Sequence, residues 1–213
     1  MEQIKELAFR MLGKIKVYDF EQGTPEWFDC RKGKMTASHA QAIGNVGKGL
    51  DTYIHEMMSE FYSSGEKEQF GSKDTERGNE LEPIARQIYE LENDVVVDQV
   101  GFMEYNKFVG ASPDGLIGEN GGWECKSPND KEYLHYLLEG IEAVDTKYLW
   151  QVQMNLLISG RDWWDLSIYN PNFKKSMITF RILPDHEKFK SLEEGFAKGV
   201  ELINKIKTKI ENE

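Results

Sequence analysis

The sequence predicts a mixed α/β fold in which helices cover a central β-sheet. Segments whose apolar residues recur every three or four positions, as in helices, are interspersed with segments in which apolar and polar residues alternate, as in strands. The chain has 213 residues and contains no low-complexity run or internal repeat. We therefore expect one domain, residues 1–213, with a substantial core.

Local signals place the elements of the first half of the chain. Thr24 followed by Pro25 is typical of a helix N-cap and a first helical residue. Pro83 is expected in the first turn of a later helix, where proline is tolerated. Apolar spacing predicts helices over 4–12, from a start within 34–39, over 52–62 and over 80–92, with a strand over 15–20 and a glycine-rich loop over 43–49.

The second half is expected to be richer in strands. Gly160 should end a helix over 147–159, because glycine commonly follows the last helical residue. The remaining expected elements are strands over 95–100 and 101–111, a hairpin over 112–126, strands over 163–169 and 177–183, and a closing helix over 186–210.

Composition limits the classes of function. Cys30 and Cys125 have no CxxC partner, which argues against a zinc ribbon or an iron–sulfur cluster and indicates reduced thiols in a cytoplasm. No apolar stretch approaches a membrane span, and the N-terminus lacks a signal-peptide pattern. The net charge of -11 is mild evidence against a nucleic-acid partner. A local groove can still be basic, and acidic residues can belong to a metal site.

Two short motifs carry the most chemistry, SPDGL from position 112 and WECK from position 123. If the second is a strand, Glu124 and Lys126 point to one face and Cys125 to the other. The glycine-rich segment 118–122 can form the hairpin turn that brings Asp114 beside Glu124. Two carboxylates and an ammonium at one edge suit a hard divalent cation with an oriented water.

Each motif alone has a structural explanation. Pro-Asp-Gly is a common turn signal, and Glu-x-Lys is a common exposed pair on a strand. The order and separation of the two motifs make the combination more specific than either motif alone. Candidate residues elsewhere in the chain are needed to choose between a structural and a catalytic role.

Further candidates lie elsewhere in the chain. Arg31 follows Trp27 by four residues, and a guanidinium beside an indole suits a terminal phosphate and a stacked base, or an ordinary surface contact. Ser38 near a helix start could bind an anion or simply cap the helix. Glu82 begins a helix, where an acid needs no function, and Glu80 competes with it for any catalytic role.

Gln153 interrupts an apolar helical stripe. A buried amide needs hydrogen-bond partners, so it either points into an active-site cleft or bonds the backbone in the core. Its apolar neighbours at helical spacing are Leu149, Trp150, Leu156 and Leu157.

Together these residues resemble the phage lambda exonuclease family, within the restriction-endonuclease-like superfamily whose signature is PD…(D/E)xK. The resemblance covers roughly residues 23–172 and implies a restriction-endonuclease-like core, a central mixed β-sheet flanked by α-helices. The matching pieces are Trp27…Arg31-Lys32-Gly33, Met35-Thr36-Ala37-Ser38, Arg77-Gly78…Glu82, Ser112-Pro113-Asp114-Gly115, Glu124-Cys125-Lys126, Gln151-Val152-Gln153 and Tyr169-Asn170-Pro171.

The resemblance also implies roles. Asp114 and Glu124 would bind magnesium, two ions per site with manganese able to substitute, helped by the Cys125 backbone carbonyl and by Glu82 as a further acid. Lys126 would orient or deprotonate the attacking water.

The same resemblance implies a binding site for the DNA end. Arg31, Ser38 and Ser112 would hold the 5′-phosphate, with Trp27 beside them, and Gln153 would help to position the catalytic groups.

The implied activity is an ATP-independent 5′-to-3′ exonuclease that digests one strand of linear double-stranded DNA to mononucleotides and leaves 3′ overhangs. The implied setting is a phage or prophage gene product in the bacterial cytoplasm, a ring-shaped homo-oligomer such as a trimer, and a single-strand-annealing recombination partner. Two alternatives are kept: an endonuclease of the same superfamily and a non-catalytic DNA-binding protein.

Overall fold

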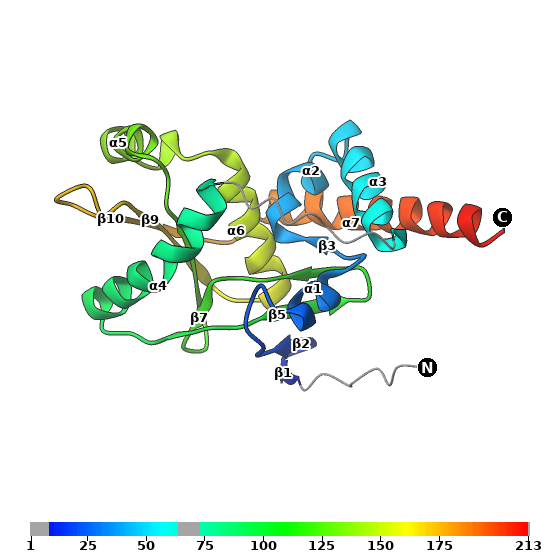
Figure 1. Ribbon diagram of the computed structural model, residues 1–213, viewed down its shortest axis with the longest axis horizontal. Coiled ribbons are helices and arrows are strands. Elements are labelled where there is room, and N and C mark those ends of the chain that lie inside the picture. Colours follow the sequence, from blue (N-terminus) through cyan, green and yellow to red (C-terminus); the bar gives the residue numbers. More distant parts are fainter. Residues whose placement is uncertain (1–8, 64–72, 213) are drawn as a thin grey trace.

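The computed structural model describes residues 9–63 and 73–212 and confirms the mixed α/β fold class (Figure 1). The described part contains two five-stranded sheets instead of the single expected one. The first sheet has the spatial order β1 (Arg10–Leu12), β2 (Ile15–Tyr18), β5 (Phe102–Asn106), β6 (Val109–Ala111) and β3 (Met35–Thr36). The second has the order β10 (Met177–Ile182), β9 (Trp163–Tyr169), β8 (Gly121–Lys126), β7 (Gly115–Ile117) and β4 (Val97–Asp98).

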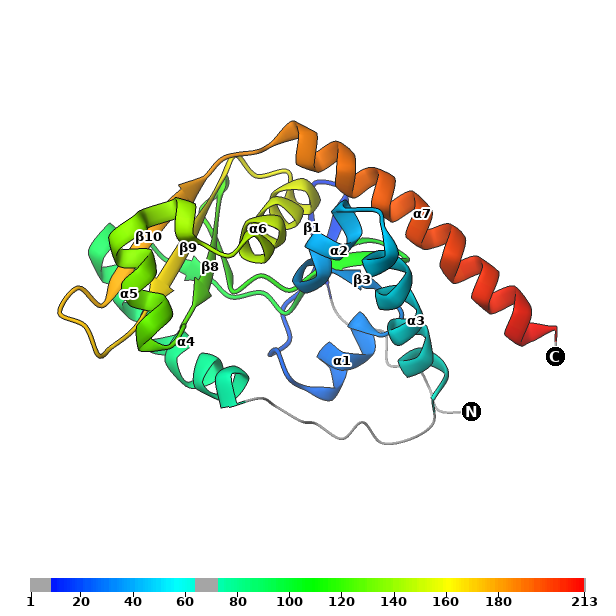
Figure 2. The ribbon, with the colours of Figure 1, turned by 90° about the horizontal axis from the view of Figure 1, so that it is seen from above.

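Helices pack around both sheets. Figure 2 shows the last and longest of them, α7, running along the outside of α6, α2 and α3. In the described residues no helix is both long and apolar enough to cross a membrane. The helices are α1 (Pro25–Arg31), α2 (Ala40–Gly44), α3 (Lys48–Tyr62), α4 (Lys73–Asn93), α5 (Asp130–Glu139), α6 (Thr146–Ser159) and α7 (His186–Glu211), with short 3-10 turns η1 (Ala37–His39) and η2 (Gly140–Ala143).

The second sheet has α4 on one face and α6 on the other. β8 pairs antiparallel with β7 and parallel with β9, so its side chains alternate between the two faces. Trp123 and Cys125 pack into the core that includes Tyr89 of α4. Glu124 points to the opposite face, where Asn155 of α6 contacts it. The face of Glu124 is therefore the face that α6 covers.

Two tryptophans of β9 lie directly over glycines of β8. A Cβ added at Gly122 would come within 2.2 Å of the Trp164 ring, and one added at Gly121 within 2.2 Å of the Trp163 ring. No side chain fits at either position, because real Cβ atoms do not approach other atoms that closely. The glycine pair thus leaves room at the start of β8 for one indole on each face of the sheet.

A polar cluster attaches α4 to this sheet. The Tyr89 hydroxyl donates to Asp165 Oδ2 at 2.6 Å, and Arg181 binds the same carboxylate through Nε at 2.8 Å and Nη2 at 2.9 Å. The Arg181 guanidinium also stacks on the Trp163 ring at 3.7 Å. Asp165 is buried, and an ionised buried carboxylate needs such donors. The cluster fixes α4, the helix that carries Glu82, against β9 and β10.

Several predicted elements are confirmed. Thr24 Oγ1 accepts a hydrogen bond from Trp27 N at 3.4 Å at the start of α1, and Pro25 is the first helical residue. α6 ends at Gly160, whose φ of 67° is the left-handed conformation that glycine adopts easily. The strands near 15–20, 163–169 and 177–183 and the helices near 52–62 and 186–210 are present as β2, β9, β10, α3 and α7.

Other predictions are wrong. Residues 10–12 form β1 rather than helix, because they pair with β2; residues 4–8 lie outside the described part. The helix start expected within 34–39 is found at Ala37, where η1 leads into α2, but Met35 and Thr36 before it form β3, since Met35 pairs with Val109 of β6. α4 begins at Lys73, which places Pro83 inside the helix instead of in its first turn. Tertiary pairing overrides local spacing at β1 and β3.

The helix α5 was not predicted. Its start follows a recognisable signal: the Asn129 side chain accepts a hydrogen bond from Glu132 N at 3.0 Å, and two acids stand in the first turn. Tyr133 and Tyr136 are its buried residues, three positions apart as on one helical face.

Candidate active site

The β7–β8 hairpin brings the first acid to the second, as the motif spacing predicts. Gly115 pairs with Trp123 in the antiparallel register, which places Asp114 next to Glu124. Asp114 Oδ2 accepts a hydrogen bond from the backbone amide of Cys125 at 2.7 Å. Cys125 thus contributes to the site through its backbone, although the predicted role of its carbonyl as a metal ligand stays a prediction.

Arg161 binds the backbone of the turn between β7 and β8. Its Nη1 donates to the carbonyl oxygens of Ile117 at 3.1 Å, Gly118 at 3.0 Å and Gly121 at 2.5 Å. Arg161 is buried and belongs to the segment between α6 and β9. A buried guanidinium that binds three carbonyl oxygens holds the turn closed, and with it the separation of Asp114 and Glu124. No sequence signal identified this residue.

Glu124 and Lys126 share one face of β8, as strand alternation predicts. Lys126 Nζ lies 2.7 Å from Glu124 Oε1. The Glu124 side chain is 1% exposed and that of Lys126 is 21% exposed, so the ammonium lies between the buried carboxylate and solvent. The ring of Tyr148, in the first turn of α6, is 5.4 Å from Lys126 Nζ.

Two amides of α6 complete the surroundings of Glu124. Gln151 Nε2 donates to Glu124 Oε1 at 2.5 Å, and Asn155 Nδ2 donates to Glu124 Oε2 at 3.1 Å. The two residues are four positions apart and therefore lie on one helical face. In Figure 1, α6 stands at the centre of the molecule, between β9 and β10 on one side and α2 and α3 on the other.

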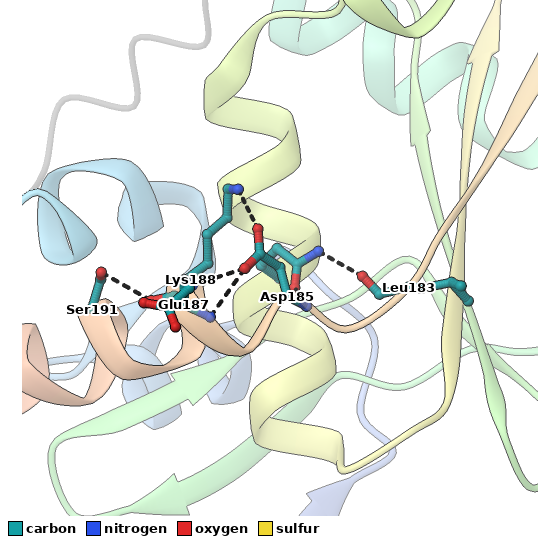
Figure 3. A network of polar contacts seen from close by, with 6 residues as sticks. Leu183, Asp185, Glu187, Lys188 and Ser191 are labelled. Atoms are coloured by element: carbon teal, nitrogen blue, oxygen red, sulfur yellow. Dashed lines mark hydrogen bonds and ion pairs between the residues drawn. The ribbon is translucent and has the colours of Figure 1, made fainter.

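The structure does not bring Gln153 to the carboxylates. Two positions from Gln151, it lies on a different side of α6. Its Nε2 donates to the Leu183 carbonyl at 2.9 Å and its Oε1 accepts from the Asp185 amide at 2.8 Å. Figure 3 shows this turn between β10 and α7, where Asp185 also binds Lys188. Of the two explanations for the buried amide, backbone bonding in the core is the one observed, and Gln151 occupies the place expected for Gln153.

Electrostatics at the site is dominated by negative charge. Burial raises the pKa of Asp114 well above its ordinary value, and the charges of Glu124 and Glu82 raise it further. Burial likewise raises the pKa of Glu82, again with a contribution from Glu124. For Lys126, burial opposes the charged form, but Glu124 and Asp114 outweigh it and raise the pKa. Of the two candidate acids on α4, the half-buried Glu82 interacts with the site, while Glu80 is exposed.

The donors fit a hard divalent cation. Three carboxylates around one ammonium leave uncompensated negative charge in a poorly solvated place. Within residues 9–63 and 73–212, no three His, Cys, Asp or Glu side chains are grouped to hold one ion, so Glu82 does not join Asp114 and Glu124 as a third ligand here. Two protein carboxylates are nevertheless typical for Mg²⁺, which keeps several waters and binds substrate phosphate.

The predicted partners of a DNA end also meet in space. Trp27 Nε1 and Arg31 Nη1 each donate to Ser112 Oγ, both at 2.9 Å, and the Arg31 guanidinium stacks on the Trp27 ring at 4.1 Å. Burial lowers the pKa of Arg31 to about 10. In the described part of the chain no carboxylate forms a salt bridge with Arg31. A half-buried cation without an acidic partner among these residues is suited to bind an anion.

A cavity of about 580 Å³ opens beside Arg31. Its lining includes Trp27, Arg31, Thr36, His39 and Tyr53. The rings of His39 and Tyr53 are stacked at 4.0 Å with an interplanar angle of 9°.

Ser38 lies next to this lining. It is exposed, and its Oγ is 3.3 Å from Thr36 Oγ1 and 3.2 Å from His39 Nδ1. Trp27 and Arg31 therefore contact Ser112 directly, whereas Ser38 contacts Thr36 and His39, two residues of the cavity lining.

One segment links the cavity to the acidic site. Ser112 and Asp114 are separated only by Pro113, whose carbonyl accepts a hydrogen bond from Gln22 Nε2 at 2.9 Å. The same Gln22 nitrogen donates to the Val100 carbonyl at 3.1 Å. The loop before α1 thus holds the segment from which both Ser112 and Asp114 project.

Comparisons with known proteins give a consistent result. Residues 26–162 match the model of the YqaJ-like viral recombinase domain. The structure of an alkaline exonuclease, LHK-Exo from Laribacter hongkongensis, is similar with a TM-score of 0.76 at 28% identity, over 89% of this chain and 99% of that chain. Its complex with dAMP gives a TM-score of 0.78 at the same identity and coverage.

A phage related exonuclease from Haemophilus somnus 129PT is similar in fold, with a TM-score of 0.69 at 15% identity over 83% of this chain and 96% of that chain. No curated protein sequence matches the chain. The structural matches confirm the restriction-endonuclease-like fold class.

Proposed function

Because the chain belongs to the family of YqaJ-like viral recombinase domains, we propose that it is a nuclease of recombination, and specifically a magnesium-dependent, ATP-independent 5′-to-3′ exonuclease on linear double-stranded DNA. It would release mononucleotides and leave 3′ overhangs for strand annealing. The observation that carries this proposal is the convergence of Asp114, Glu124 and Lys126 beside the Arg31 cavity. The dAMP complex of LHK-Exo supports a nucleoside monophosphate product.

Asp114 and Glu124 would hold the cation, with the Cys125 carbonyl as a further oxygen donor and Glu82 as a nearby acid. Two Mg²⁺ ions, or Mn²⁺ in their place, would supply Lewis-acid stabilisation of the attacking and leaving oxygens at the scissile phosphate. Lys126 presents its ammonium at the solvent side of Glu124, where it attracts the phosphate and orients the attacking water. Gln151 keeps Glu124 in place.

Arg31 and Ser112 would bind the 5′-phosphate, with Ser38 at the edge of the cavity and Trp27 as a surface for the terminal base. Since Ser112 and Asp114 belong to one segment, an end that is bound at Arg31 lies near the acids. Binding energy realised only at a DNA end makes a nuclease end-specific.

The remaining expectations are part of the same proposal. The protein would act as one exonuclease unit over residues 1–213, assemble as a ring-shaped homo-oligomer around DNA, and work with a single-strand-annealing protein in the bacterial cytoplasm. An endonuclease of the same superfamily is the second candidate, because the acids and the lysine alone do not require a DNA end.

The test is digestion of three DNA substrates in Mg²⁺ without ATP. Linear duplex with labelled 5′-phosphate ends should be degraded to mononucleotides, the same duplex with 5′-hydroxyl ends more slowly, and supercoiled plasmid not at all. Cleavage of the closed circle would instead favour the endonuclease. Equal rates on the two kinds of end would contradict the 5′-phosphate pocket.

A further inference from the structure

Asn155 is a second buried amide at the acidic site. It is 0% exposed, and its Nδ2 donates to Glu124 Oε2 at 3.1 Å. In the part of the chain that the structure describes, its Oδ1 is buried and has no hydrogen-bond partner. The residue thus has one contact to the site and one unsatisfied atom.

That unsatisfied atom shows that Asn155 is not explained by packing. A buried acceptor without a donor costs about 1–3 kcal/mol of stability. Leucine has a similar shape and would avoid the cost at this position of α6, where Val152, Leu156 and Ile158 are also buried. A residue that costs stability at a site usually serves function there. For Asn155, the functional contact is the hydrogen bond from Nδ2 to Glu124.

The hydrogen bonds of Glu124 show what that donation achieves. Oε1 accepts two hydrogen bonds, from Lys126 and Gln151, which occupy both of its lone pairs. Oε2 accepts one, from Asn155, and keeps one lone pair. With both oxygens held, the carboxylate cannot rotate, and among the hydrogen bonds of residues 9–63 and 73–212 only Oε2 keeps a lone pair without a donor.

We propose that Asn155 is a positioning residue for the cation: by holding Oε2, it fixes Glu124 so that the remaining lone pair of this oxygen is available to the metal. The inference rests on the proposed function, because it presupposes a cation between Asp114 and Glu124. It extends that function, since removing Asn155 should weaken the cation affinity while the lysine, the acids and the DNA-end pocket stay in place. Losing a supporting hydrogen bond to a metal ligand typically lowers metal affinity by about 10- to 100-fold.

The experiment measures Mn²⁺ binding by isothermal titration calorimetry without DNA, together with thermal unfolding and digestion kinetics. For Asn155→Leu we expect the Mn²⁺ dissociation constant to rise by about 10-fold or more. We expect kcat to fall at limiting Mn²⁺ while KM for DNA is unchanged. Asn155→Ser, whose hydroxyl is too short to reach Glu124, should show the same loss and provides a second variant if the leucine does not fold.

Gln153→Leu is the matched control. It removes a buried amide from the same helix, but that amide bonds to Leu183 and Asp185. It should lower the unfolding temperature and leave the Mn²⁺ affinity unchanged. If the Asn155 variants bind Mn²⁺ as the unaltered protein does, the positioning role is refuted and the proposed function stands. If the unaltered protein binds no Mn²⁺, the cation site fails and the inference with it.

Discussion

Replacing Lys126 with alanine is expected to abolish DNA cleavage while DNA binding survives. Lys126 Nζ lies 2.7 Å from Glu124 Oε1 and is the ammonium next to the acids. Removing one preorganised charge donor typically costs 10²- to 10³-fold in rate, so we expect a loss of about 10³-fold in kcat. Digestion of labelled linear duplex in Mg²⁺ gives the rate, and fluorescence anisotropy with the same duplex in EDTA gives the affinity.

Lys131→Ala is the matched control for this prediction, because Lys131 is an exposed lysine on α5. It should digest DNA at the rate of the unaltered protein. A Lys126→Ala protein that binds and cleaves normally would remove Lys126 from the chemistry, and one that loses binding as well would give it a role in holding DNA instead.

Arg31→Ala is expected to remove the preference for 5′-phosphorylated ends. Arg31 is half-buried, has no acidic partner among the described residues, and donates to Ser112 Oγ. A hydrogen bond to a charged group contributes about 1.5–3 kcal/mol, which corresponds to about 10- to 100-fold in kcat/KM for the phosphorylated duplex. The kcat/KM for the 5′-hydroxyl duplex should stay the same, because that end offers the guanidinium no anion.

The comparison of the two ends separates recognition from folding. Since Arg31 also packs on Trp27, the variant can lose some stability, and a destabilised protein would lose activity on both kinds of end. Arg10→Ala is the control; this exposed arginine pairs with Asp19, and its loss should change neither rate. An Arg31→Ala protein that still prefers the phosphorylated end would place the phosphate elsewhere.

The acidic site could be predicted because its geometry is local. A hairpin of known turn chemistry and a two-residue strand period are enough to bring Asp114 to Glu124 and to align Lys126 with it. The pairing of Trp27 with Arg31 is also local, since residues four apart are helical neighbours.

The partners that come from other elements could not be predicted in the same way. Ser112 and Arg31 are 81 positions apart in the sequence, and their hydrogen bond depends on how α1 lies against the end of β6. The choice between Gln151 and Gln153 depends on the rotation of α6 about its axis, which apolar spacing leaves open when the helix is surrounded by core. The role of Asn155 could not be predicted from the sequence, because a single amide within an apolar helical segment does not indicate which residue it contacts.

The split of one expected sheet into two has a similar origin. Alternating segments predict strands without saying which strands pair, and β1, β2 and β3 join β5 and β6 instead of the sheet that carries the acids. The net charge of -11 is likewise compatible with a DNA-processing site, because Asp114 and Glu124 belong to the proposed cation site, with Glu82 near them, and the half-buried Arg31 lines a separate cavity.

The central claim is that Asp114 and Glu124 together hold a divalent cation. Anomalous diffraction from crystals soaked in Mn²⁺ tests it directly, because the signal locates the ion without reference to activity. We predict an anomalous peak within coordination distance of Asp114 and of Glu124 Oε2, with Lys126 beside it. A well-occupied Mn²⁺ peak elsewhere on the protein, with none between these two carboxylates, would contradict the account.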